Sequence, residues 1–229
     1  MSSRLDFPKS SIHCLLITLE RLGYLQRLES SGRYVAGLSL VRIATMASHG
    51  ATLRQKAGPL LADLAQRTNL TVHLAVLENN EALLIAKVGP SVTPPVATWV
   101  GKRIDYHCTS LGKALIAWLP DEEVGRLVKE RRMLRHNENT ISTLARLQED
   151  LMRTRRVGYA VDDEEEEIGI RCVGAPVLGS SGKVEAAVSV SGTVDQIRSE
   201  DLPRVGALLQ EAAFELSRRL GWTPSLAVP

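Results

Sequence analysis

Residues 8–36 read PKSSIHCLLITLERLGYLQRLESSGRYVA, and this stretch decides how the N-terminal part of the chain is interpreted. Apolar residues at 12, 15, 16, 19 and 22 recur at helical spacing, Pro8 suits a first helical turn, and Gly23 is a usual helix stop. Two short strand-like segments flank the turn at 29–32, which predicts a β-hairpin. A helix followed by a hairpin tipped with Arg33 is typical of the second half of a winged helix-turn-helix, which places its helix in the DNA major groove.

The two faces of this helix predict different roles. The apolar positions are expected to form one buried stripe, whereas the opposite face carries small polar and basic side chains. A structural alternative is a helix–hairpin corner with a solvated polar face, and the physics of the segment alone favours neither reading. If the segment binds DNA, the expected contact residues are Lys9, Ser10, Ser11, His13, Cys14 and Arg21 on the helix and Arg33 at the wing.

The rest of the composition is that of an ordinary globular protein. The chain has 229 residues and a net charge of +2, which excludes a wholly basic nucleic-acid coat protein but not a local basic surface. Residues 1–50 hold six Lys and Arg against three acidic residues, so the other residues carry 22 against 23. The three Cys form no CxxC pair and are expected to be free thiols. No signal peptide or membrane span is recognisable, and a cytoplasmic protein without a membrane partner is predicted.

Beyond residue 38 the pattern alternates between helices and strands. A helical pattern runs over 38–67 with interruptions near Gly50 and Gly58, and a domain boundary is expected near Ser48, giving domains 1–48 and 49–229. The predicted strands are 72–76, 82–88, 97–100, 171–178 and 185–191, and the later helices are 110–119, 122–131, one around 144–151 that ends by Gly158, and 200–220. The pattern indicates an α+β fold with a mainly antiparallel sheet flanked by helices.

Searches for catalytic and metal-binding motifs give nothing. No GxSxG elbow, Walker loop, HExxH or GxGxxG is present, and the five His show no metal-ligand spacing, so neither an enzyme nor a metal or cofactor site is expected. His73 is interpreted as a packed or hydrogen-bonded strand residue. The six consecutive acids from Asp162 to Glu167 are interpreted as a solvated loop, although the first of them could point inward because an apolar strand follows.

Several segments resemble the IclR family of bacterial transcriptional regulators. The segments LDFPKSSIHCLL (5–16), LERLGYL (19–25) and GRY (32–34) look like the family's recognition helix and wing strand. Farther along, HCTSLGKAL (107–115), GYAVDDEE (158–165), GIRCVGAPV (169–177) and AVSVSG (187–192) resemble its effector-domain signature in order and spacing. The resemblance runs from about residue 5 to 220 and implies a partial winged helix-turn-helix, a linker helix and a GAF/PAS-like effector-binding domain.

The resemblance also implies a small-molecule effector, usually a carboxylate. Carried over by position, the pocket would be formed by Ser110, Leu111, Asp162, Cys172, Ser189 and Ser191. Ser110 could cap the helix that it begins, leaving N–H groups for an anion, and Ser189 and Ser191 alternate onto one strand face. Ordinary cap or strand duty is the alternative for each Ser. Lys113 is expected to be solvated or to snorkel.

The sequence departs from the family pattern in two respects. Cys14 stands where the family usually has Arg, which removes a candidate guanine contact. Family members also carry a first helix and most of a second before this segment; we expect the natural chain to continue upstream, the alternative being a metabolite sensor that does not bind DNA. A GAF-type thiol redox enzyme using Cys172 is a further alternative. Family members form dimers that pair into tetramers, and a homo-oligomer that binds double-stranded operator DNA is expected here.

Overall fold

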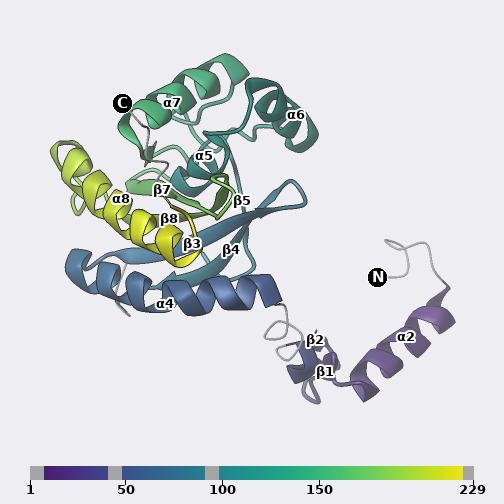
Figure 1. The fold of residues 1–229 in the computed structure, drawn as a ribbon. Helices are drawn as coiled ribbons and strands as arrows, with labels where there is room; N and C mark the ends of the chain where they lie inside the picture. The colour runs from purple at the N-terminus through teal and green to yellow at the C-terminus, as the bar shows by residue number, and fades with distance from the viewer. Residues whose placement is uncertain (1–7, 41–47, 91–97, 224–229) are drawn as a thin grey trace. The chain divides into compact units, whose positions relative to one another are not determined.

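The computed structural model describes residues 8–40, 48–90 and 98–223, which divide into two units, Met1–Leu53 and Arg54–Pro229. The first contains the helix and hairpin expected at the N-terminus, and the second contains a six-stranded sheet with helices on its faces (Figure 1). The α+β fold class is thereby confirmed. No helix among the described residues is long and apolar enough to cross a membrane.

The N-terminal unit consists of one helix and one short hairpin. Helix α2 covers Lys9–Arg21 and is followed by strands β1, Leu25–Arg27, and β2, Tyr34–Ala36, which pair antiparallel. Gly23 follows the helix with a φ of +75°, a left-handed conformation that glycine adopts without strain. A side chain at Gly37 would collide with the Gly23 carbonyl, 2.2 Å from the position of its Cβ, so both glycines are needed where the chain turns into the hairpin and leaves it.

The buried stripe expected along α2 is wrong for the described part of this unit. Ile12 is buried, but Leu15 and Leu22 are 55% and 56% exposed and Leu19 is 37% exposed. The physical reason is the small partner surface, because within the described residues the helix packs mainly against β1 of a hairpin whose strands have three residues each. The periodicity predicted the position of the helix correctly, but no described element buries its leucine face.

Helix α4, Ser48–Thr68, leads into the second unit, which then builds an antiparallel sheet in the order β5-β4-β3-β8-β7-β6. The strands are β3, Thr71–Glu78; β4, Glu81–Val88; β5, Arg103–Ile104; β6, Ala160–Asp163; β7, Ile170–Leu178; and β8, Val184–Thr193. The helices after α4 are α5, Ser110–Ile116; α6, Asp121–Arg131; α7, Leu144–Val157; and α8, Leu202–Arg219, which follows a single turn of 3-10 helix at Ser199–Asp201.

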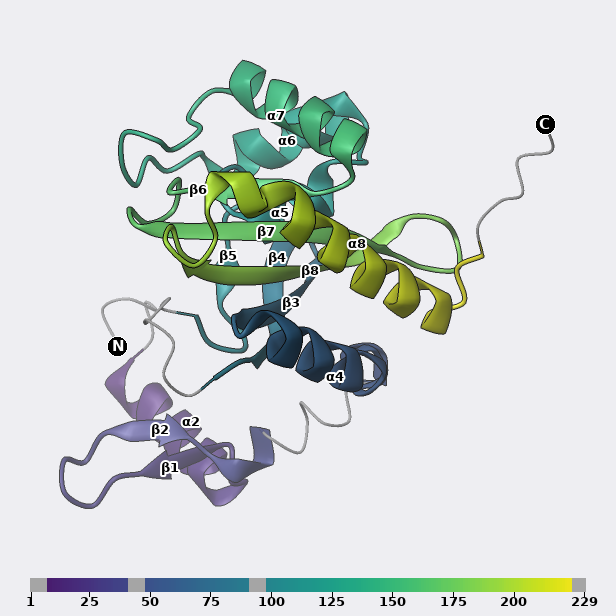
Figure 2. The ribbon, with the colours of Figure 1, turned by 90° about the vertical axis from the view of Figure 1, so that its left-hand side faces the viewer.

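The helices form layers on both faces of the sheet (Figures 1 and 2). Helix α5 packs on β7 and β8, and α6 and α7 lie beyond it; α8 packs on β7 and β8 beside α4. Because side chains alternate along a strand, Ala187 joins the core formed with α5, α6 and α7, whereas Val188 and Val190 point to the other face. The sheet is therefore covered on both sides, and polar residues on the α5 face are buried with it.

Three sequence predictions of local structure need correction. Helix α4 continues through Gly58 and Pro59, because Ala57, Leu61 and Leu64 are almost wholly buried and this packing outweighs the hydrogen bond that Pro59 cannot donate. The described part of the strand expected at 97–100 is irregular, and the pairing strand there is β5 instead. Strand β6 was not expected, since two of its four residues belong to the acidic run.

Candidate functional site

Polar side chains form two neighbouring rows across the α5 face of the sheet. In the first row Asp162 pairs with Cys172, Cys172 with Ser191, and Ser191 with Thr71. In the second row, two residues along each strand, Ala160 pairs with Gly174, Gly174 with Ser189, and Ser189 with His73. Four of the six residues expected to bind an effector thus lie side by side on three adjacent strands. We call these eight positions the polar row pair.

Helix α5 lies directly over the second row. A Cβ on Gly174 would come within 2.7 Å of the Ser110 carbonyl oxygen, so the helix start is seated where the strand has no side chain. Ser110 is 1% exposed and faces this region, whereas Leu111 belongs to the apolar core. The expected Ser110 cap is wrong: Thr109 is the N-cap residue, and its hydroxyl accepts a hydrogen bond from the Gly112 N–H at 3.0 Å. Thr109 therefore already occupies one N–H group that the sequence prediction left for an anion.

Burial sets the protonation states in the polar row pair. Desolvation raises the pKa of Asp162 to about 8, against the opposing charge of Lys113, so this carboxyl is mostly neutral at pH 7. Its Oδ1 accepts hydrogen bonds from the Glu165 N–H at 2.9 Å and the Glu166 N–H at 3.4 Å. Burial, reinforced by the Asp162 charge, raises the pKa of the Cys172 thiol well above its usual value. A reactive thiolate at Cys172 is therefore disfavoured.

His73 belongs to the polar row pair, although the sequence analysis interpreted it as a packed or hydrogen-bonded strand residue. The prediction of a packed or hydrogen-bonded residue is confirmed, because His73 is 2% exposed and its Nε2 lies 2.9 Å from the Thr98 hydroxyl. Its Nδ1 lies 3.4 Å from Ser191 Oγ, which places it at one end of the polar row pair. Burial, with the charges of Lys87 and Lys102, lowers the pKa of His73 to about 3, so the ring is neutral. The one signal in the sequence that could have assigned His73 to the site was a single His within a mainly apolar strand, Thr71–Glu78.

Beneath Asp162 lies a buried charge cluster that the sequence did not reveal. Lys113, expected to be solvated or to snorkel, is instead wholly buried, so that prediction is wrong. Its ammonium donates to Asp150 Oδ2 at 3.0 Å, Glu165 Oε1 at 2.6 Å and the Val161 carbonyl at 2.7 Å. Burial alone lowers the pKa of Lys113, but the two carboxylates outweigh it and the pKa is raised. Burial raises the pKa of Glu165 despite the nearby ammonium. The long polar side chain is held inside because all three of its N–H donors have acceptors.

The acidic run divides into inward and outward members. Asp162 and Glu165 are 2% and 7% exposed, so the inward position expected of the first residue is confirmed and the solvated loop expected of the rest is wrong for Glu165. Glu166 forms an ion pair with Lys102 at 3.1 Å. This ion pair links the segment after β6, next to Asp162, to the segment that carries Thr98, next to His73. Asp162 and His73 lie on the two outer strands of the polar row pair, so the ion pair connects the segments at its two ends.

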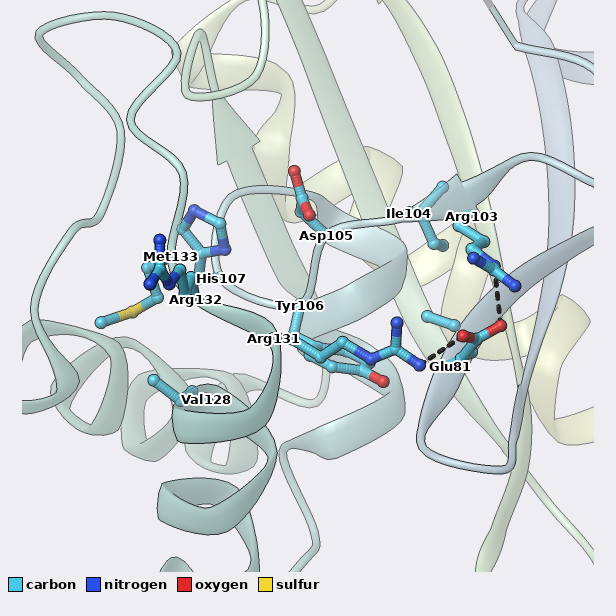
Figure 3. A pocket seen from close by; sticks show the side chains of 11 residues that line it. Glu81, Arg103, Ile104, Asp105, Tyr106, His107, Val128, Arg131, Arg132 and Met133 are labelled. Carbon is cyan, nitrogen blue, oxygen red and sulfur yellow. Dashed lines mark hydrogen bonds and ion pairs between the residues drawn. The ribbon is translucent and has the colours of Figure 1, made fainter. Parts of the chain in front are cut away.

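A cavity of about 200 Å³ opens elsewhere, beside β4, β5 and α6 (Figure 3). Glu81 lies in its wall between Arg131 and Arg103, the latter at 2.7 Å. None of the six residues expected to bind an effector lines this cavity. The polar row pair gathers residues from four strands and lies under α5, whereas the Arg103 and Arg131 side chains of the cavity are 70% and 40% exposed, so the polar row pair is the stronger candidate for an effector site.

The residues expected to contact DNA are at the surface of the N-terminal unit. Lys9, Ser10, His13, Cys14 and Arg21 are exposed on α2, Ser11 is half-buried there, and Arg33 is exposed at the end of the hairpin turn. The turn is closed by a hydrogen bond from the Leu28 N–H to the Arg33 carbonyl at 2.8 Å. One helix thus presents these side chains together, with the wing following in the same unit.

Comparison with known proteins identifies the family. Residues 45–218 match the family model of the bacterial transcriptional regulator IclR C-terminal domain. The regulator XynR of Escherichia coli is 34% identical over 222 residues, which cover 97% of this chain and 88% of XynR.

Solved structures agree with this. The IclR crystal structure from Thermotoga maritima has a TM-score of 0.80 and 31% identity, covering 96% of this chain and 89% of that one. An IclR homologue from Microbacterium hydrocarbonoxydans, solved in complex with 4-hydroxybenzoate, has a TM-score of 0.85 and 25% identity, covering 96% and 88% of the two chains. The helix and hairpin, the layered effector-type domain and these matches together show that the chain belongs to the IclR family of ligand-responsive transcriptional regulators and is not an enzyme.

Proposed function

We propose that the chain binds a small organic acid in the polar row pair and operator DNA through α2 and the wing. Residues 1–48 would form the DNA-binding domain and 49–229 the effector domain, and the working form would be a cytoplasmic homodimer or pair of dimers. The observation that carries the effector site is the continuous register from Asp162 through Cys172 to Ser191, with Ser189 and His73 beside it. The relative bound to 4-hydroxybenzoate supports an acid as the ligand class.

A neutral Asp162 resolves the charge conflict that an anionic ligand would otherwise meet. The protonated carboxyl can donate a hydrogen bond to a ligand carboxylate, as can the hydroxyl groups of Ser189 and Ser191. Neutral His73 can donate from one ring nitrogen. Because these groups are buried, a ligand that makes such bonds in place of water is bound by charge-assisted hydrogen bonds in a low dielectric. A metabolite that favours one domain arrangement would then shift operator affinity by the coupling free energy, about 1–3 kcal/mol.

A thermal-shift screen followed by calorimetry tests the effector site. The panel contains keto, hydroxy and aromatic acids, each paired with its uncharged amide. We expect at least one acid, and not its amide, to raise the melting temperature. Ser191→Ala should weaken binding of that acid by about tenfold or more, since one charge-assisted hydrogen bond is worth about 1.5–3 kcal/mol. Ser181→Ala, in the exposed β7–β8 turn, is the matched control. Absence of any shift, or equal effects of the two variants, would refute the assignment.

A second candidate function is a metabolite sensor that does not read DNA. The observation favouring it is the exposed leucine face of α2, which gives the helix little support within the described residues. Gel shifts on the flanking promoter should compare this chain with one extended upstream by the preceding in-frame codons. Binding by either form supports the regulator, whereas two silent forms that still bind the acid support the sensor.

A further inference from the structure

We propose that Asp105, Cys108 and His136 form a binding site for Zn²⁺ beside the polar row pair. Asp105 and Cys108 are three residues apart, but His136 lies 28 residues beyond Cys108, and this spacing is no recognised metal signature. In the structure they offer one oxygen, one sulfur and one nitrogen ligand atom, all within 4.8 Å of one another. His136 Nε2 lies 2.9 Å from Asp105 Oδ2. This inference does not rest on the proposed effector.

The donor set and its spacing fit zinc. Thiolate, imidazole and carboxylate are the usual zinc ligands, at about 2.3, 2.0 and 2.1 Å, and tetrahedral coordination places such donors roughly 3.3–3.7 Å apart. The Asp105–His136 separation of 2.9 Å lies just below that range and no two donor atoms are more than 4.8 Å apart, so small side-chain rotations would bring the three donors to coordination distance. Three protein ligands leave a fourth position for water. Mg²⁺ and Ca²⁺ prefer all-oxygen sites and are not matched by a thiol and an imidazole.

Two short anchored segments hold the donors in place. Asp105 and Cys108 lie in the strap between β5 and α5, where the Thr109 hydroxyl donates to the Asp105 carbonyl at 2.6 Å. His136 lies in the α6–α7 loop, where its N–H donates to Thr140 Oγ1 at 3.1 Å and its ring stacks on His107 with a centroid distance of 6.4 Å. Such second contacts fix the orientation of metal ligands.

Solvent reaches the site on one side, and the polar row pair lies near it on another. Asp105 and His107 line the cavity of Figure 3, which provides an entry path for the ion. Thr140 Oγ1 donates to the Glu165 carbonyl at 2.8 Å, and the Asn137 amide donates to the Glu164 carbonyl at 3.0 Å. A bound ion would therefore cross-link the strap to the loop that holds the acidic segment after Asp162.

The chemistry of binding is an exchange of one proton for the ion. The Cys108 Sγ–H bond breaks, its proton goes to water, and the sulfur binds zinc as a thiolate. His136 supplies the Nε2 lone pair once the proton on this nitrogen, which faces Asp105 in the structure, has moved to Nδ1, and Asp105 supplies a carboxylate oxygen. Affinity should consequently rise with pH, as it does for thiol-containing zinc sites.

Cobalt titration of the reduced, chelator-treated full chain tests the site. We expect one equivalent of Co²⁺ to produce a thiolate-to-cobalt absorption band that Zn²⁺ abolishes. Cys108→Ser should remove the band, and Cys14→Ser, on the exposed face of α2, should keep it. His136→Gln retains a hydrogen-bond donor for Asp105 but loses the imidazole, and it should weaken binding at least about tenfold while the metal-free melting temperature stays near wild type.

The contrary outcomes are equally definite. A chain that binds no Co²⁺, a band that survives Cys108→Ser, or an affinity unchanged by His136→Gln would overturn the proposal. If Cys108→Ser fails to fold, since Cys108 is buried, the partly exposed His136 still decides the matter through His136→Gln. A melting temperature lowered equally by His136→Gln with and without metal would show that His136 only packs the loop.

Discussion

Replacing Lys113 with Met is the most informative single perturbation of the effector domain. Methionine keeps the length and flexibility of the side chain, so little cavity forms, but the three hydrogen bonds of the ammonium are lost. Asp150 retains Arg153 at 3.4 Å, whereas the Glu165 side chain keeps only a 3.5 Å contact from the Asp163 N–H, and its Oε2 has no partner among the described residues. Glu165 is therefore the carboxyl that loses its countercharge in Lys113→Met.

The expected loss in the free energy of unfolding depends on which carboxylate is left without a cation. Removing one member of a buried ion pair typically costs about 3–5 kcal/mol, and because Asp150 keeps a second cation we expect a value near the lower end, about 3 kcal/mol at pH 7. In the variant, the folded-state pKa of Glu165 lies above its unfolded value, since burial raises it and the ammonium no longer opposes this. The penalty on the folded state then grows as pH rises from the unfolded pKa of Glu165 to its raised folded-state pKa and levels off above it, so the loss should shrink toward acid pH.

Urea unfolding followed by tryptophan fluorescence measures this directly. All three tryptophans, Trp99, Trp118 and Trp222, lie in the second unit, so the signal reports that unit alone. The control is Lys102→Met, which breaks a partly exposed pair at 3.1 Å and should cost less than about 1 kcal/mol. Lys113→Met combined with Glu165→Gln should recover much of the loss. A loss no larger than that of the control, or a double variant no more stable than Lys113→Met, would refute the reasoning.

Three further outcomes are expected. The affinity for an anionic effector, measured by calorimetry, should fall by up to about tenfold per pH unit above pH 8, where Asp162 ionises. Asp162→Asn should flatten this profile, and a wild-type profile without a break near pH 8 would contradict a neutral Asp162. Gly174→Ala should lower the free energy of unfolding in urea by about 1–3 kcal/mol, because its Cβ would meet the Ser110 carbonyl at 2.7 Å. The control Gly58→Ala in α4 meets nothing within 4 Å and should raise it by about 0.5–1 kcal/mol. Equal effects would show that α5 is loosely packed on Gly174. Cys14→Arg should tighten operator binding in gel shifts at fixed salt by about 1–3 kcal/mol for sites with a suitably placed guanine, and an unchanged affinity for every site would place residue 14 away from the bases.

Local patterns in the sequence predicted most of the secondary structure. The helix closed by Gly158 and the strands at 171–178 and 185–191 were recognisable because their periodicity and turn residues act over a few positions. Alternation also predicted that Ser189 and Ser191 share a face, which the register with β7 and β3 confirms.

The interactions that the sequence could not predict are long-range. Lys113 pairs with Asp150 and Glu165, 37 and 52 residues away, and a lysine inside an apolar helix looks the same whether its head reaches water or a buried carboxylate. Asp105, Cys108 and His136 come together only because the α6–α7 loop folds back over the strap before α5. Likewise, the helical period of α2 says which side chains are apolar but not whether another element covers them.

The position of β6 gives the acidic run a second consequence. The six-stranded sheet ends in two short strands, β5 with two residues and β6 with four. An open strand edge invites a strand from another copy, and proteins guard such edges with short length and charge. The outward carboxylates that follow β6 would repel an identical chain approaching along that edge. We expect the acidic residues beside the proposed effector site thereby also to guard this edge against edge-to-edge aggregation.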